Sequence, residues 1–255
     1  MKKYVLAIIL IFKLYLLFLD YLGGTELEIK FADRMDNIKE GIFTTLANLK
    51  KDRLKQGKEC YDISVGTPDF VPDKHVMEAL TEASKYAENY KYAITDSDEL
   101  INAVKNWYKR RYNVELESDE IMSLYGSQEG LSRVCLTLCN PGDIVLVPNP
   151  GYPIFSLGPA LNDAKIVEYE LREENNYLID FSSISEETAA AAKAMIVSYP
   201  ANPICRLAPK EFYKELIEFA KKYNIVILHD NAYSELVYDG NEGISFLSID
   251  GAKEV

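Results

Sequence analysis

The sequence has little histidine and no closely spaced cysteine pair, and both shortages limit its metal chemistry. Only His75 and His229 occur in 255 residues, too few and too far apart in sequence for a metal cluster. None of the four cysteines forms a Cys-x-x-Cys pair, and Cys135 and Cys139 lie four residues apart on an apolar helical pattern. Buried thiols of this kind usually pack in a core. We therefore expect no metal site.

Basic residues are also in short supply. The chain has 28 Lys and Arg residues against 40 Asp and Glu residues, which gives a net charge of −12. Nucleic-acid binding draws on clustered Lys and Arg, so nucleic acid is not expected as a partner. The basic run Lys105 to Arg111 is interpreted as a solvated helix face. With 48% hydrophobic residues, the composition is typical of a globular protein and agrees with a cytoplasmic α/β enzyme.

Residues 1–24 form an apolar segment, but a charged residue interrupts it before it is long enough to span a membrane. After a basic start, Lys13 interrupts the apolar residues between Val5 and Leu19. A spanning helix needs about 20 apolar residues, and a lysine near its centre is costly. The residues from Asp20 onwards make a poor signal-peptide cleavage site. Three interpretations stay open: a segment that gives membrane contact, a signal peptide, and a non-native upstream extension.

The remaining sequence alternates between short apolar runs and amphipathic patterns. In the last amphipathic segment, for example, Phe212, Leu216 and Phe219 share one helical face. Strands alternating with helices predict a mainly parallel sheet that is covered on both faces. The expected strands lie near 144–148, 165–170, 194–198 and 225–229, and the expected helices at 74–88, 98–112, from 129 onwards and at 209–223.

The most informative segment is 225–233, which reads IVILHDNAY. Its apolar run predicts a buried parallel strand with Asp230 at the carboxyl end, where open α/β sheets bind ligands. A buried carboxylate needs a cationic partner, and the segment holds no Lys or Arg. A ligand cation such as a protonated pyridine nitrogen is therefore a candidate. The alternative is that Asp230 caps a short helical turn from Asn231 to Leu236.

Three further loops follow strand-like or apolar segments. Gly126 and Ser127 open the helical pattern that continues through Leu131, and free N–H groups at such a helix start suit a phosphate. Tyr152 follows the apolar run 144–147, and Asn202 follows the run 194–197. No single one of these loops identifies a function.

In this order and spacing, the four loops resemble the class I/II aminotransferases that use pyridoxal 5′-phosphate, the aspartate-aminotransferase-like branch of fold type I. The resemblance runs from about Glu28 to Val255. It includes Val65-Gly66-Thr67-Pro68-Asp69-Phe70, Asn106-Trp107-Tyr108, Asn140-Pro141-Gly142-Asp143 and Tyr238-Asp239-Gly240. The implied fold is a three-layer α/β large domain with a mainly parallel sheet, incomplete, with part of the small domain. Residues 25–70 would form an N-terminal arm and part of the small domain, and residues 71–255 the cofactor-binding large domain.

The resemblance implies roles for the residues around the cofactor ring. Asp230 would keep the pyridine nitrogen protonated, so that the ring can accept electrons. Tyr233 and Asn202 would donate hydrogen bonds to the ring's phenolic oxygen. Tyr152 would stack on the ring face; the alternative is a turn tyrosine that covers the sheet edge.

The resemblance also implies contacts to the phosphate and the substrate. Ser127 and the backbone at Gln128 would bind the phosphate. Gly66 would contact the substrate carboxylate through its backbone, unless this glycine only serves the turn. Tyr92 would reach the phosphate of the neighbouring subunit, since the full-length family is expected to be homodimeric.

Two departures from the family pattern stand out. The family typically has Asn-Pro-Thr-Gly where this chain has Asn202-Pro203-Ile204-Cys205, and a positive φ at Cys205 would cost about 1 to 2 kcal/mol. The family's Ser-x-Ser-Lys segment, whose lysine forms the Schiff base with the cofactor, would lie beyond Val255. Lys253 is too early to replace that lysine.

The resulting hypothesis is an aminotransferase that moves an amino group between an amino acid and a 2-oxo acid, and that is inactive at this length because the Schiff-base lysine is missing. A truncated reading frame, a pseudogene product and one half of a split gene would each explain that length. Two other classes stay open: a fold-type-I lyase that uses pyridoxal phosphate, such as a C–S lyase, and a non-catalytic vestigial fragment.

Overall fold

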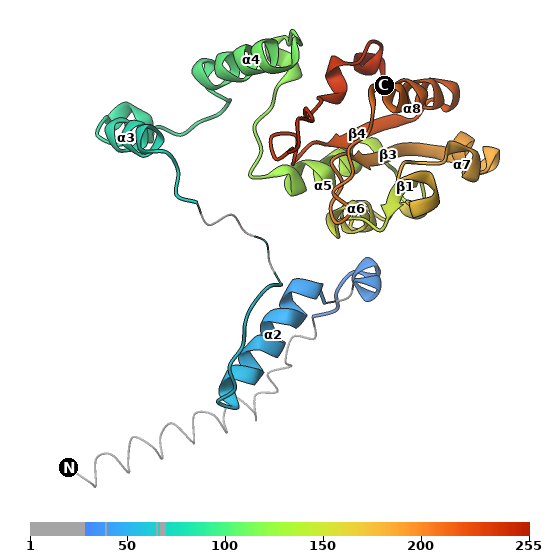
Figure 1. Ribbon diagram of the computed structural model, residues 1–255, viewed down its shortest axis with the longest axis horizontal. Helices are drawn as coiled ribbons and strands as arrows, with labels where there is room; N and C mark the ends of the chain where they lie inside the picture. The colour runs from blue at the N-terminus through green and yellow to red at the C-terminus, as the bar shows by residue number, and fades with distance from the viewer. Residues whose placement is uncertain (1–28, 39, 65, 67–69) are drawn as a thin grey trace, which may run out of the picture. The chain divides into compact units, whose positions relative to one another are not determined.

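The computed structural model describes residues 29–38, 40–64, 66 and 70–255 (Figure 1). The expectations for residues 1–24 therefore lie outside the described residues. The chain divides into two compact units, Met1–Asn37 and Ile38–Val255. Within the described ranges, no helix is both long and apolar enough to cross a membrane.

Four parallel strands form the sheet of the second unit. They are β1 (Ile144–Asn149), β2 (Lys165–Glu170), β3 (Ala192–Ser198) and β4 (Val226–Asp230), in the order β2-β1-β3-β4. The central strands are rich in buried Val, Ile, Met and Ala, as expected for strands covered on both faces. Ser198 pairs in register with Asp230, so β3 and β4 end side by side.

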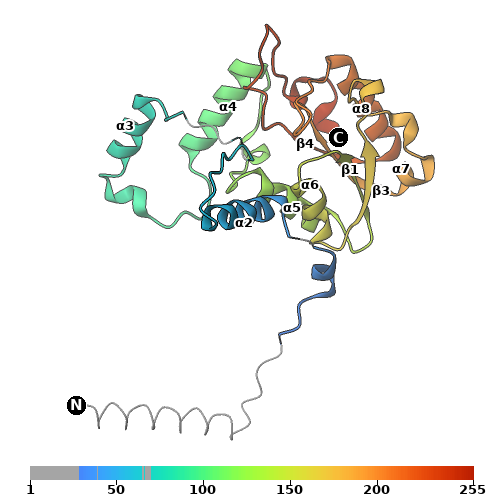
Figure 2. The ribbon, with the colours of Figure 1, turned by 60° about the horizontal axis from the view of Figure 1, so that its bottom comes forward.

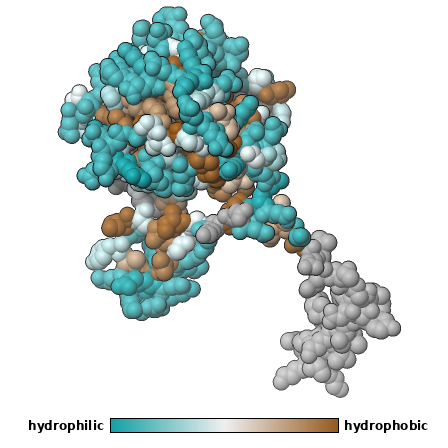
Figure 3. Space-filling model, turned by 90° about the vertical axis from the view of Figure 1, so that its right-hand side faces the viewer, coloured by the Kyte–Doolittle hydropathy of each residue, from teal (hydrophilic) through white to brown (hydrophobic). Residues whose placement is uncertain are grey.

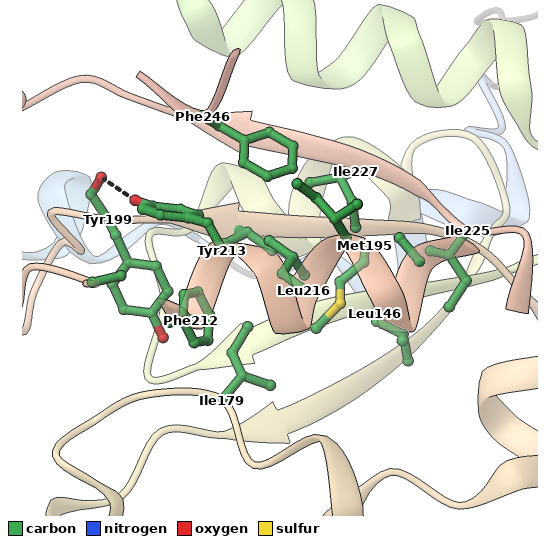
Figure 4. Close-up of a cluster of buried hydrophobic side chains, with 14 of the residues drawn as sticks. Leu146, Ile179, Met195, Tyr199, Phe212, Tyr213, Leu216, Ile225, Ile227 and Phe246 are labelled. Carbon is green, nitrogen blue, oxygen red and sulfur yellow. Dashed lines mark hydrogen bonds between the residues drawn. The ribbon is translucent and has the colours of Figure 1, made fainter. Parts of the chain in front are cut away.

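Helices cover both faces of this sheet (Figure 2). On one face, α8 (Lys210–Tyr223) packs the buried side chains Phe212 and Leu216 against Met195 and Ile227 of the sheet (Figure 4). The other face carries a second apolar cluster, to which α6 (Ile154–Ala160) contributes. A mainly parallel sheet that is covered on both faces is thus confirmed.

The helix α5 (Ser127–Leu138) packs closely on α6. Gly158 makes this possible because a Cβ there would lie only 3.3 Å from Ser132 Cα. The side-chain amide of Asn162 joins the two helices by donating to the carbonyl oxygens of Ser132 and Gly158, at 3.0 and 2.8 Å.

Three further helices precede the sheet in sequence: α2 (Ile42–Lys55), α3 (Lys74–Ala83) and α4 (Asp98–Tyr112). Neither α2 nor α3 buries a residue. Many apolar side chains from this part of the chain are exposed, among them Ile63, Phe70 and Tyr125. The surface in Figure 3 is largely hydrophilic with apolar patches.

The expected elements agree with the structure at most positions. The helix predicted at 74–88 is shorter, because α3 ends at Ala83 and a separate 3-10 helix spans Ala87–Tyr90. The helix expected from 129 begins two residues earlier, at Ser127. Asp230 belongs to β4, and residues 232–235 form only a turn, so the alternative of a helix cap at Asp230 is wrong.

Candidate functional site

The candidate site lies where parallel strands end. Asn149, Ser198 and Asp230 are the last residues of β1, β3 and β4. Tyr152, Asn202 and Tyr233 follow these strand ends by three or four residues. Because parallel strands share one carboxyl edge, the sheet brings these loops to the same side of the fold.

Asp230 carries a desolvated carboxylate at the end of β4. Its side chain is partly buried, and this desolvation raises its pKa above the ordinary value. Within the described part of the chain its carboxylate forms no ion pair, although a buried charge normally has a partner. A protonated ring nitrogen at this place would supply the missing positive charge, so the site fits the pyridine ring of pyridoxal phosphate.

A hydrogen bond joins Asn202, in the loop after β3, to Tyr233, in the loop after β4. The amide Nδ2 of Asn202 donates to the Tyr233 hydroxyl at 3.1 Å, although the two residues are 31 positions apart. Since the Tyr233 oxygen accepts this bond, its own proton stays free to donate to a further acceptor. The pair therefore offers the hydrogen-bond donors that an ionised phenolic oxygen requires.

The loop that carries Asn202 contains a side chain in the left-handed region. Cys205 has φ of +59°, as expected from the glycine that the family typically has at this position. The Cys205 amide donates to the Ala201 carbonyl oxygen and closes the turn, while the Ala201 amide donates to Arg206 O at 3.3 Å. Residues 201–206 are thus held together by their own backbone.

The start of α5 faces the loop after β1. Gly126 precedes this helix with φ of +97°, a backbone conformation that a residue with a Cβ rarely adopts. Ser127 opens the helix, and Gln128 Nε2 donates to the Tyr152 hydroxyl at 3.1 Å. The Tyr152 ring also packs edge-on against Phe155, with the ring centroids 6.1 Å apart. The Tyr152 side chain is therefore held by Gln128 at its hydroxyl and by Phe155 at its ring. The start of a helix such as α5 suits an anion, because its first N–H groups have no partner within the helix.

Two predicted residues make no contact with these groups. Tyr92 is 92% exposed, and its contact with a neighbouring subunit stays a prediction. Gly66 is exposed, and a Cβ added there would meet nothing within 4 Å. Neither residue is joined to the Asp230 edge by a described contact.

Lys253 lies at the opposite end of β4 from Asp230. Its ammonium donates to Glu120 Oε2 at 2.7 Å and to Glu115 O at 2.9 Å. Two residues later, Val255 O accepts a hydrogen bond from Ile227 N at 2.9 Å, near the start of β4. Lys253 is therefore a structural contact, and the expectation that it does not replace the Schiff-base lysine agrees with this position.

The sequence did not reveal one group of residues beside the site. Arg111, interpreted as part of a solvated helix face, instead bonds Glu235, and its neighbour Tyr112 bonds both Ser234 and Glu235. These partners are more than 120 positions apart in sequence, so no local pattern could have indicated them.

The sequence of this chain is similar to those of known proteins. The sequence profile described as aminotransferase class I and II matches residues 58–253. This chain belongs to the class I and II aminotransferases. The family uses pyridoxal phosphate.

Several curated members of the family are similar in sequence. The LL-diaminopimelate aminotransferase of Aquifex aeolicus is 39% identical over 228 residues, which cover 89% of this chain and 59% of that protein. The protein of the same name from Halothermothrix orenii is 39% identical over 226 residues, which cover 88% of this chain and 58% of that protein. The chain thus spans about three fifths of the length of the curated relatives it matches.

Solved structures confirm the fold. Substrate-bound BacF from Bacillus subtilis superposes with a TM-score of 0.84 at 33% identity, covering 89% of this chain and 58% of that one. An aspartate aminotransferase from Rhizobium meliloti gives a TM-score of 0.80 at 21% identity, covering 88% of this chain and 56% of that one. The α/β fold with its four-stranded parallel sheet is therefore that of a portion of a fold-type-I aminotransferase.

Proposed function

We propose that this chain supplies the cofactor-binding groups of an aminotransferase that uses pyridoxal phosphate to move an amino group between an amino acid and a 2-oxo acid. The observation that supports this most strongly is the partly buried Asp230 carboxylate at the carboxyl end of β4, which has no cation beside it in the described part of the chain. Family membership makes a pyridinium nitrogen the natural partner of this carboxylate.

Each group has a separate task in this proposal. Asp230 holds a proton on the ring nitrogen through a charge-assisted hydrogen bond. Tyr233 donates its free proton to the phenolic oxygen, and Asn202 orients that hydroxyl through the 3.1 Å bond. Tyr152 lies against the ring face, and its hydroxyl is fixed by Gln128 at 3.1 Å. The first turn of α5, from Ser127, binds the phosphate through its free N–H groups.

When bound, the cofactor supplies an electron sink for the substrate α-carbon. The groups of this chain set the electronic state of that sink, since a carboxylate at the ring nitrogen keeps the ring cationic. Loss of this counter-charge should therefore lower the affinity for the cofactor and the protonation of its ring nitrogen. The hydrogen bonds that join Gln128 to Tyr152 and Asn202 to Tyr233 orient these side chains, so we assign these residues to binding and orientation.

The curated relatives suggest a first substrate to assay. Proteins named LL-diaminopimelate aminotransferase are 32 to 39% identical to this chain. LL-diaminopimelate with a panel of 2-oxo acids is the starting assay for a full-length protein with this segment.

Binding of 4′-deoxypyridoxine 5′-phosphate tests the proposal directly. This analogue keeps the ring nitrogen, phenolic oxygen and phosphate but lacks the aldehyde, so only non-covalent groups can hold it. We expect measurable binding by the chain in equilibrium dialysis, and at least a tenfold loss in Asp230→Asn, because a charge-assisted hydrogen bond contributes roughly 1.5–3 kcal/mol.

The matched control is Asp250→Asn, the same change at an exposed aspartate. This variant should bind as tightly as the parent. Equal affinity of Asp230→Asn and Asp250→Asn would contradict the proposal.

A further inference from the structure

The loop that carries Tyr233 has little regular structure of its own. Residues 231–245 contain a turn at 232–235 and a second turn at 239–240, but no helix or strand. Backbone bonds within the loop include Leu236 N to Tyr233 O at 2.9 Å and Asn241 N to Tyr238 O at 3.2 Å. Such a loop needs contacts from outside to hold a hydroxyl in one place.

Arg111, at the end of α4, joins the two arms of this loop. Its Nε donates to both carboxylate oxygens of Glu235, at 3.1 and 3.2 Å. Its terminal NH2 group donates to the carbonyl oxygen of Gly243 at 3.4 Å. The guanidinium thus contacts the outgoing arm two residues after Tyr233 and the returning arm ten residues after it.

Tyr112 adds a second attachment to the same arm. Its hydroxyl donates to Glu235 Oε1 at 2.8 Å and lies 2.9 Å from Ser234 Oγ. A carboxylate can only accept, so the single phenolic proton goes to Glu235 and Ser234 must donate to Tyr112. Ser234 is only 5% exposed, and the Arg111 guanidinium carbon lies 4.9 Å from the centre of the Tyr112 ring.

Gly243 allows the two arms to touch. A Cβ at this position would lie 1.8 Å from the carbonyl oxygen of Ser234. The backbone of the returning arm therefore rests against the residue that follows Tyr233. Arg111 bridges both arms, and Ser234 and Glu235 directly follow Tyr233 in the chain.

We propose that Arg111 and Tyr112 are positioning residues that hold the Tyr233 hydroxyl against Asn202 by clamping Ser234, Glu235 and Gly243. None of the described hydrogen bonds of Arg111 or Tyr112 goes to Asn202, Asp230 or Tyr233 itself. The role of this clamp rests on the proposed function, in which Tyr233 donates a hydrogen bond to the phenolic oxygen. Its geometry is independent of any cofactor.

The test is fluorine NMR of the full chain with 3-fluorotyrosine installed at position 233. Asn202→Ala gives the resonance of a Tyr233 hydroxyl that has lost its partner. In Tyr112→Phe we expect the resonance to move toward that reference position. Amide hydrogen exchange in residues 231–236 should become about tenfold faster, as expected for the loss of one hydrogen bond to a charged group.

The matched control is Tyr108→Phe, one helical turn earlier, which removes a hydroxyl but keeps the ring that packs 5.4 Å from Tyr112. It should leave the resonance and the exchange rates unchanged. If Tyr112→Phe does not fold, Arg111→Lys is read by the same criterion, since it keeps the charge but cannot span both arms.

The proposal would be overturned if Asn202→Ala shifted the Tyr233 resonance and Tyr112→Phe did not. Faster amide exchange in Tyr112→Phe without that shift would show a role in loop stability alone. Titration of the same samples with pyridoxal phosphate separates the two claims. If the resonance moves but the cofactor does not bind, the proposed function fails and the clamp stands. Cofactor binding with an unmoved resonance would remove the clamp alone.

Discussion

At the scale of single residues, Asp230 works against the stability of the fold. Desolvation raises its pKa, so the folded chain binds the proton more tightly than the unfolded chain does. Stability from this group is therefore present at low pH and is lost as pH rises from the ordinary Asp value through the raised one. A residue that destabilises the cofactor-free protein at neutral pH is typical of a binding site.

Replacing this charge should stabilise the cofactor-free chain. Asp230→Asn keeps the shape and removes the desolvated charge, so we expect Tm at pH 7.5 to rise. Thermal unfolding followed by circular dichroism measures this. The gain should vanish at a pH well below the ordinary Asp value, where the parent carboxyl is also neutral. A lower Tm for Asp230→Asn at pH 7.5 would show that Asp230 has a stabilising partner.

Cys205 carries a second local cost. Its φ of +59° lies in the left-handed region, which is unfavourable for a residue with a Cβ. Cys205→Gly should raise the free energy of unfolding by about 1 kcal/mol, measured by urea denaturation. Cys205→Ala is the control, because it removes the thiol but keeps the Cβ, and it should give no such gain. Equal gains in both variants would assign the effect to the thiol.

At the scale of elements, successive side chains of β4 point to opposite faces of the sheet, so that His229 and Asp230 lie in different surroundings. His229, the neighbour of Asp230 in the strand, packs between Tyr213 of α8 and Phe246, with ring centroids 5.6 Å from each. Tyr213 also donates to the Tyr199 carbonyl oxygen at 3.5 Å (Figure 4), so α8 contacts the start of the Asn202 loop. Burial lowers the pKa of His229 to about 4.

This buried histidine predicts acid sensitivity. Because the folded-state pKa lies below the ordinary value of 6.5, the unfolded chain binds more protons between these two values. Stability should therefore fall as pH drops from 6.5 to 4, by about 3 kcal/mol. His229→Phe should lose less stability than the parent over this range in urea denaturation. Parallel losses in both proteins would show that His229 does not titrate as described. The stability that Asp230 gains as the pH drops is the same in the parent and in His229→Phe, so it cancels when the two proteins are compared.

The elements predicted from sequence were those with strong local patterns. The β-branched runs at 144–147 and 225–228 and the stripe containing Phe212 and Leu216 sufficed for β1, β4 and α8. By contrast, α6 was missed because Gly158 and Pro159 are poor helix formers in the interior of a helix. Close packing of Gly158 on Ser132 favours this helix, and no local pattern reports such a contact.

At the scale of the whole molecule, parallel topology brings the candidate site together. The sequence alone predicts Asp230 at one strand end and the loops of Tyr152 and Asn202 at two others. The bond between Asn202 and Tyr233 depends on β3 and β4 being neighbours in register. Strand order makes β3 and β4 neighbours. The alternation of strands and helices in the sequence predicts a shared carboxyl edge, but it predicts neither the bond between Asn202 and Tyr233 nor the clamp on Glu235.

The central claim is that Asp230 is the counter-charge of a pyridinium nitrogen. The most direct measurement is the 15N chemical shift of the ring nitrogen in labelled pyridoxal phosphate bound to the chain at pH 8. We predict a protonated ring nitrogen with the parent chain and an unprotonated one with Asp230→Ala, because only the parent supplies the carboxylate. A bound ring nitrogen with the same shift in both proteins would contradict the account.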